Sequence, residues 1–236
     1  MLRFYAQNFN AVELNVTFYR LPAAKSMEAM AKNTPERFRF VAKVNQGATH
    51  TKNLGEVRPA CRAFLRCLAP LRGEGKLGAV VAQLPERARP TKQELDRLRY
   101  IADELRELRL LFEFRHARWA TPKLKGLLKR LGAGFCCSDL PQLPRLMPRL
   151  QLAVGPVAMV RLHGRNAAAW AAKGGEKERY DYLYSAEELR EWVSWVWSLA
   201  EQEDVYVFMN NCYSGKAVIN ARMFQALLRL EDELVA

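Results

Sequence analysis

The chain has 236 residues, 50% of them hydrophobic, which is enough to bury the core of one barrel-sized domain and excludes an intrinsically disordered protein. Its longest apolar runs, such as residues 79–82, are too short to cross a bilayer, and no signal-peptide pattern opens the sequence. The 5 cysteines form no CxxC pair, which favours reduced structural thiols. These features predict a cytoplasmic protein with no membrane partner.

The chain is strongly basic, with 37 Lys and Arg against 25 Asp and Glu and a formal net charge of +12. Such a charge attracts phosphate groups, so nucleic acid is one candidate partner. The basic residues are dispersed along helical segments and form no basic tail, which favours solvated helix faces instead. Examples are Arg97, Arg99, Arg106 and Arg109, and then Lys123, Lys125, Lys129 and Arg130.

Seven runs rich in apolar, β-branched and aromatic residues predict short β-strands, over 11–16, 38–44, 77–83, 110–115, 134–139, 157–163 and 205–211. Helical patterns separate most of them, over 25–32, 55–71, 91–108, 122–131, 185–202 and 217–228. Two of these helices open with a capping box, Thr91 with Glu94 and Ser185 with Glu188. A third has Pro122 at its first position and ends at Gly132.

The alternation of strands and helices predicts an α/β fold with parallel strands and crossover helices. Each unit spans about 34 residues, which is the spacing of a TIM-type (β/α) barrel. A doubly wound open sheet is the alternative, but it would ordinarily carry a Gly-rich phosphate loop, and neither GxGxxG nor GxxxxGK[ST] occurs. We therefore expect a single barrel domain over residues 1–236.

Polar residues recur near the carboxyl end of the predicted strands, where the active sites of such barrels lie. They are Glu13, Asn15, Lys43, Gln83, Glu113, Arg115, Asp139, Arg161, His163, Asn210 and Asn211. Alternation along a strand places Glu13 with Asn15 on one face, and likewise Glu113 with Arg115 and Arg161 with His163. If these pairs point inward, they form a polar ligand pocket, although buried salt bridges of purely architectural role would give the same pattern.

The same segments contain seven recognisable blocks in order: VELNVTFYRLP, FRFVAKV, LGAVVAQLP, FEFRHARW, VRLHGR, YDYLYSAEEL and FMNNCYSGKAVINA. Together they closely resemble the YecE-like family, also called domain of unknown function 72. The resemblance implies a TIM barrel and brings no established reaction. Members usually open with a further strand bearing a Gly-Thr-Ser-Gly-Trp type motif, which this sequence lacks. We therefore expect about seven strands and a gap beside the Glu13 strand, filled by a helix, a loop or a neighbouring chain of a homo-oligomer.

Three groups are candidates for catalysis. Glu13 and Glu113 could divide acid and base roles, as in glycoside hydrolysis or isomerisation, or each could simply pair with a cation. His163 could act as a base or as a donor to an anionic oxygen, or be a hydrogen-bonded barrel histidine. A divalent metal would need ligands such as Asp139 or His116 beside these groups, but no ligand-spaced motif is present and the neighbouring cations would repel it. No cofactor motif is found.

Those cations favour an anionic ligand. Lys43, Arg115 and Arg161 could clamp a phosphate or carboxylate, and Asn15, Asp139, Asn210 and Asn211 could bind hydroxyl or amide groups, with Tyr19 and Tyr182 as flat walls for a sugar or base. The leading hypothesis is an enzyme acting on a small phosphorylated or sugar-like substrate. The alternatives are a nucleic-acid-binding or nucleic-acid-processing protein and a non-catalytic metabolite-binding module.

Overall fold

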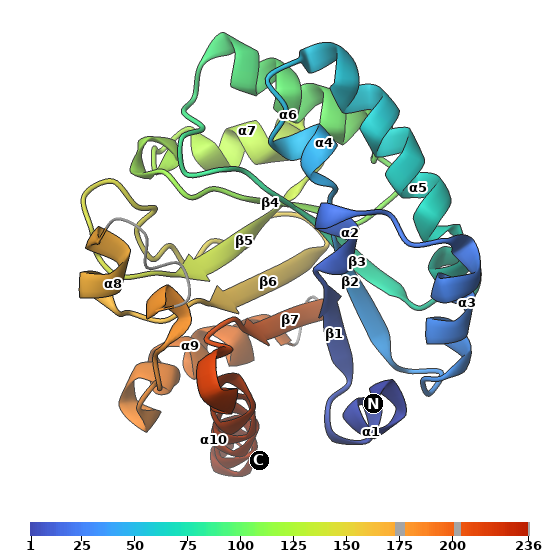
Figure 1. Cartoon of the computed structure of the whole chain (residues 1–236). Helices are drawn as coiled ribbons and strands as arrows, with labels where there is room; N and C mark the ends of the chain where they lie inside the picture. Colours follow the sequence, from blue (N-terminus) through green and yellow to red (C-terminus); the bar gives the residue numbers. More distant parts are fainter. Residues whose placement is uncertain (173–177, 201–203, 236) are drawn as a thin grey trace.

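Seven parallel strands follow one another in chain order around a nearly closed, TIM-like barrel (Figure 1). The computed structural model describes residues 1–172, 178–200 and 204–235. The strands are β1 (Ala11–Leu14), β2 (Arg39–Lys43), β3 (Leu77–Gln83), β4 (Leu110–Glu113), β5 (Gly134–Asp139), β6 (Val157–Leu162) and β7 (Asp204–Met209). The predicted α/β barrel with seven strands is confirmed.

Helices and short 3-10 turns connect the strands. The α-helices are α1 (Leu2–Asn8), α2 (Val16–Tyr19), α3 (Ala24–Lys32), α4 (Gln46–Thr49), α5 (Val57–Gly73), α6 (Lys92–Glu104), α7 (Leu124–Arg130), α8 (Ala167–Ala171), α9 (Ala186–Ala200) and α10 (Lys216–Val235). The 3-10 turns are η1 (Leu54–Glu56), η2 (Ala117–Trp119), η3 (Glu178–Tyr180) and η4 (Tyr213–Gly215). Within the described residues, no helix combines the length and apolar character needed to span a membrane.

Local hydrogen bonds explain several element boundaries. At α9 the capping box is complete, because Ser185 Oγ accepts from the Glu188 amide at 3.3 Å and Glu188 Oε2 accepts from the Ser185 amide at 3.0 Å. At α6 the capping box is incomplete. The Glu94 amide donates to Thr91 Oγ1 at 3.3 Å, but the Glu94 side chain pairs with Arg97 instead of with the Thr91 amide. The predicted first strand is two residues too long, because Asn15 is already helical in its backbone and opens α2.

Alternate strand residues form two apolar layers. The inner layer fills the barrel with Val41, Ala79, Val81, Leu111, Cys136, Val157, Met159, Tyr206 and Phe208. The outer layer, which includes Phe112, Phe135 and Cys137, packs against the helices. Tyr206 reaches across the barrel to Gly78 of β3, where a Cβ atom would collide with the Tyr206 hydroxyl. The barrel floor is therefore packed, and open space lies towards the carboxyl ends of the strands.

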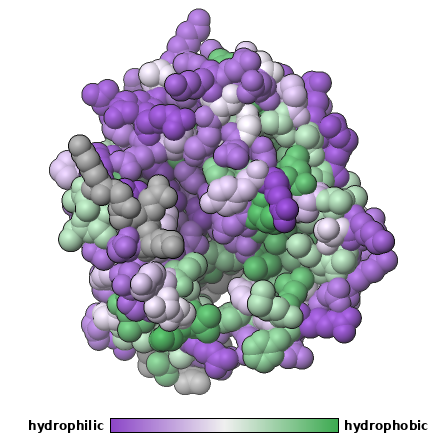
Figure 2. Space-filling view, viewed as in Figure 1, coloured by the Kyte–Doolittle hydropathy of each residue, from purple (hydrophilic) through white to green (hydrophobic). Residues whose placement is uncertain are grey.

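The barrel is open between β1 and β7. In the described chain β1 pairs only with β2, and β7 only with β6. A crevice of about 330 Å³ lies between the two strands, bordered by residues of α1 and α10 such as Tyr5 and Phe224. Figure 1 shows β1 and β7 next to each other, with α1 and α10 near them. The space-filling view shows hydrophobic residues below the centre, where β1, β7 and α10 lie (Figure 2). The predicted gap beside the Glu13 strand is thus confirmed.

Candidate functional site at the carboxyl end of the barrel

Charged side chains from β1, β4 and β6 meet inside the barrel around the guanidinium group of Arg161. Its Nε and Nη2 donate to the carboxylate of Glu13 at 2.9 and 2.7 Å. Its Nη1 forms an ion pair with Glu113. Arg161 is only 2% exposed, so this guanidinium is neutralised by two carboxylates away from bulk water.

The carboxylate of Glu113 is the most enclosed group of the cluster. Arg115 Nε lies 2.5 Å from Glu113 Oε1, and His163 Nε2 lies 3.4 Å from the same oxygen. Burial alone would raise the pKa of Glu113, but Arg115 and Arg161 outweigh it and hold that pKa well below its usual range. Glu113 is therefore a permanent anion and a weak base.

His163 is fully buried, and burial together with Arg115 lowers its pKa to about 3. It is neutral at physiological pH. Its Nδ1 lies 3.3 Å from Asn210 Nδ2, a contact in which Nδ1 accepts if the ring proton is on Nε2. That tautomer also directs the Nε2 proton towards Glu113, so the histidine links β6 to β7 and to the acidic centre.

Glu13 and Glu113 both lie against basic side chains in this structure. Both carboxylates turn their oxygens towards cations, as expected if each pairs with a basic side chain. Their shared contact with Arg161 fixes that guanidinium in one orientation. In the described structure the two glutamates thus hold the cations in place.

Above this cluster a pocket of about 420 Å³ opens at the mouth of the barrel. We call it the mouth pocket. Among the described residues, its walls contain three cations and no carboxylate. The lining residues are Asn15, Tyr19, Lys43, Gln83, Arg115, Arg161, Tyr180, Asn210, Cys212 and Tyr213.

Lys43 is the cation of this pocket that has no charged partner among the residues the structure describes. In the described part of the chain its ammonium group forms no ion pair and no side-chain hydrogen bond, and it lies 4.0 Å above the ring of Phe18. Burial lowers the pKa of Lys43 to about 8, and the positive charges of Arg161 and Arg115 act in the same direction. An amine with this pKa is mostly protonated at neutral pH and can release its proton slightly above it.

The position of Lys43 follows from the segments around the end of β2. Thr17 Oγ1 donates to the carbonyl oxygen of Lys43 at 2.7 Å, which ties α2 to β2. Asn45 Nδ2 donates to the carbonyl oxygens of Thr17 and Phe18 at 3.0 and 3.1 Å. These bonds hold the Phe18 ring against the lysine, so the ammonium group is covered on one side and faces the pocket on the other.

Three residues predicted to bind substrate lie outside the mouth pocket. Asp139 points towards the helices, where it accepts two hydrogen bonds from Arg165, at 2.9 and 2.7 Å, and one from Trp192. Asn211 donates to the Tyr182 carbonyl oxygen at 2.8 Å and to Asn220 of α10. The Tyr182 hydroxyl donates to Glu188. All three contacts anchor the segment that follows β6.

Other lining residues come from loops, where strand periodicity gives no signal. Tyr180 of η3 has its ring centre 6.2 Å from that of His163, and Tyr213 of η4 lies on the same pocket. The segment that carries Tyr180 packs closely against Gly164. The φ of Gly164, +94°, and the closeness of Tyr182 leave no room for a side chain at this position. Tyr180 opens the YDYLYSAEEL block, but nothing in its spacing predicts an inward position.

The remaining candidate ligand groups are not gathered for a metal ion. Within residues 1–172, 178–200 and 204–235, no three His, Cys, Asp or Glu side chains are close enough to hold one. His116 caps η2, accepting from the Arg118 amide at 3.0 Å. Burial lowers the pKa of His50 to about 4, and its Nδ1 lies 2.8 Å from Thr49 Oγ1.

Known proteins share this architecture. The model of a family described as "Protein of unknown function DUF72" matches residues 1–235. The UPF0759 protein YunF of Bacillus subtilis (strain 168) is 30% identical over 246 residues, covering 98% of this chain and 87% of that protein. A DUF72 family protein of Thermotoga maritima is 33% identical, with a TM-score of 0.84 over 96% of this chain and 87% of that one. A DUF72 family protein of Enterococcus faecalis V583 is 28% identical, with a TM-score of 0.88 over 97% of this chain and 88% of that one. The chain therefore belongs to the DUF72 family.

Proposed function

We propose that the chain is an enzyme that binds a small anionic substrate, phosphorylated or sugar-like, in the mouth pocket. The observation that carries this proposal is the lining, in which Lys43, Arg115 and Arg161 face the pocket and no carboxylate of the described residues does. Since Glu13 and Glu113 already neutralise Arg161 from below, the charge of Lys43 remains uncompensated. A phosphate or carboxylate of the substrate supplies the missing anion.

The residues around the cations suit a polyhydroxylated molecule. The amides of Asn15, Gln83 and Asn210 can exchange hydrogen bonds with hydroxyl groups. The rings of Tyr19 and Tyr180 offer flat surfaces for a sugar. Cations, amides and rings on one pocket fit a phosphorylated sugar better than a simple inorganic anion.

In this proposal Lys43 also exchanges a proton with the substrate. A catalytic acid or base works best when its pKa lies near the working pH, and the pKa of Lys43 is about 8. The acid–base role predicted for Glu13 and Glu113 passes to Lys43, because both carboxylates are engaged by Arg161. Proton transfer beside an anionic group is the chemistry of isomerases and of some hydrolases, which are the two reaction classes that we favour.

Isothermal titration with inorganic phosphate, glycerol 3-phosphate and glucose 6-phosphate tests the anion site. We expect Lys43→Met to weaken binding by about tenfold, because one charge-assisted contact is lost. The matched control is Lys25→Met, which removes the same charge from the exposed side of α3, away from the mouth pocket. Equal weakening in both variants, or unchanged binding in Lys43→Met, would contradict the proposal.

The pH dependence of the same titration tests the role of the lysine. Since an anion needs the protonated amine, affinity should fall as the pH rises through about 8, where Lys43 loses its proton. Phosphate monoesters are already dianions there, because their second pKa is about 6. Lys43→Arg should keep the affinity and remove this fall, since a guanidinium stays charged.

A further inference from the structure

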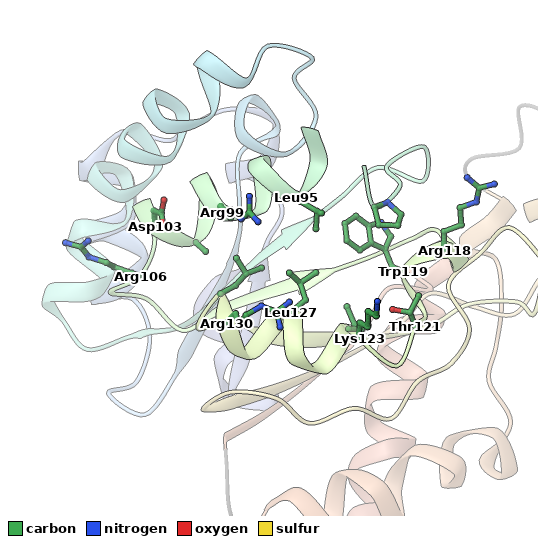
Figure 3. A pocket seen from close by; sticks show the side chains of 14 residues that line it. Leu95, Arg99, Asp103, Arg106, Arg118, Trp119, Thr121, Lys123, Leu127 and Arg130 are labelled. Atoms are coloured by element: carbon green, nitrogen blue, oxygen red, sulfur yellow. The ribbon is translucent and has the colours of Figure 1, made fainter. Parts of the chain in front are cut away.

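A third cavity lies outside the barrel, between α6 and α7, with a volume of about 650 Å³ (Figure 3). We call it the α6–α7 groove. Its floor is apolar, built from Leu95 and Ala102 of α6, from Leu124, Leu127 and Leu131 on and after α7, and from Trp119 at one end. Leu95, Leu127 and Leu131 are only half-buried, so the groove presents uncovered leucine surface.

The rim of the groove is cationic on both sides. Arg99 projects from α6 and Arg106 from the turn that follows it, and Lys123 and Arg130 stand at the two ends of α7 (Figure 3). The members of each pair are seven residues apart in the sequence, with Arg106 and Lys123 lying just outside the helices. Arg118 of η2 adds a further cation near Trp119.

Most of this charge is unpaired. Among the described residues, Arg106, Arg118 and Arg130 form no ion pair, whereas Arg99 pairs with Asp96 at 2.8 Å. Asp103 is the single carboxylate among the described lining residues, and it lies 3.0 Å from Arg58 outside the groove. The rim therefore carries net positive charge over an apolar floor.

We propose that the α6–α7 groove binds an acidic amphipathic helix of a partner protein. A helix that lays its apolar face on the leucine floor would place acidic residues on either side against the two rows of cations. The spacing of the rows favours an elongated partner, because a compact anion would contact one cation pair and leave the other unused. This surface lies outside the mouth pocket, so the proposal does not depend on the proposed enzyme function.

The groove differs from an ordinary solvated basic face. Lys125 and Lys129 also belong to α7 and are exposed, but they do not line the cavity. If this face contacted only water, we would not expect cations from two different helices to border a row of half-buried leucines. The two α7 lysines are therefore the natural internal control.

Fluorescence anisotropy with a labelled synthetic peptide tests the proposal. The peptide has about 15 residues, with leucines three and four positions apart and glutamates flanking them, so that it forms an acidic amphipathic helix. Its partner is a scrambled peptide of the same composition. The variants are Arg106→Glu with Arg130→Glu, and the control Lys125→Glu with Lys129→Glu, which changes the net charge equally. Circular dichroism confirms that both variants keep the wild-type fold.

Wild-type protein and the Lys125/Lys129 variant should bind the helical peptide, and the Arg106/Arg130 variant should bind it about tenfold more weakly. The scrambled peptide should bind as weakly as the helical peptide binds that variant. Equal binding of the two peptides, or equal loss in both variants, would overturn the proposal. So would a short single-stranded oligonucleotide that binds with the same sensitivity to Arg106 and Arg130 while the peptide does not.

Discussion

At the scale of single residues, the centre of the barrel depends on Arg161. Its side chain is 2% exposed and compensates Glu13 and Glu113, of which the second is fully buried. Removing one partner of a buried ion pair is far more costly than the pair itself is worth, because the remaining charge stays in a poorly solvated place. Arg161 therefore stabilises the fold in addition to lining the mouth pocket.

We expect Arg161→Met to lower the free energy of unfolding by about 3–5 kcal/mol at neutral pH, measured by urea denaturation. Without the guanidinium, burial at Glu113 is opposed mainly by Arg115, so the folded-state pKa of Glu113 rises from its depressed position. The deficit relative to wild type should then shrink as the pH falls through the acidic range, because Glu113 of the variant takes up a proton at a higher pH than Glu113 of the wild type.

A matched variant tests whether removing any paired arginine would lower the stability as much. Arg62→Met breaks an ion pair with Glu104 in which the arginine side chain is 61% exposed, and it should cost far less stability, because water and salt screen an exposed pair. A deficit in Arg161→Met as small as that of Arg62→Met would show that the central carboxylates are well solvated without their guanidinium.

At the scale of the elements, alternation at the end of β7 divides two consecutive asparagines between different tasks. Asn210 faces the mouth pocket and lies beside His163. Asn211 faces the other way and, with Asn220 of α10, holds the backbone of Tyr182 and Tyr184 through hydrogen bonds of 2.7–3.0 Å. The sequence marks both residues as polar strand-end positions on opposite faces, and the structure shows that Asn210 is the one that faces the pocket.

This division predicts opposite phenotypes for two neighbouring substitutions. Asn211→Ala should lower the free energy of unfolding by about 1–3 kcal/mol, since buried hydrogen bonds are left unmade, and keep the affinity for glucose 6-phosphate. Asn210→Ala should lower that affinity and change the stability little. Denaturation and titration of both variants check this, and a loss of affinity confined to Asn211→Ala would reverse the assignment.

The elements were predictable where a local signal exists. The seven strands and the complete Ser185 cap follow from periodicity and from capping chemistry. The inward positions of Glu13, Lys43, Glu113 and Arg161 follow from their strand parity. The outward position of Asp139 does not follow from a local signal, because its partners, Arg165 and Trp192, come from a loop and a distant helix. Tyr180 and Tyr213 were missed for the same reason, since loop conformation is set by long-range packing.

At the scale of the whole molecule, the barrel is a curved sheet with two free edges. The inner strands donate and accept hydrogen bonds on both sides, whereas β1 and β7 have a neighbour on one side in the described chain. Exposed edges are templates for a further strand, and the crevice of about 330 Å³ separates them here. The side chains of α1 and α10 border the crevice but offer no backbone ladder to either strand.

Hydrogen exchange followed by NMR measures the state of these edges directly. Because successive amides of a strand point to opposite sides, about half of those in β1 and β7 face the crevice, and we expect these to exchange much faster than the amides of β3 and β4. The β3 and β4 amides are the internal control, since they belong to the same sheet and are paired on both sides. Strong protection of the crevice amides at low protein concentration would contradict an open barrel. Protection that appears only as the concentration rises would instead mean that a second copy of the chain covers the edge, as the sequence-based alternative of a homo-oligomer predicts.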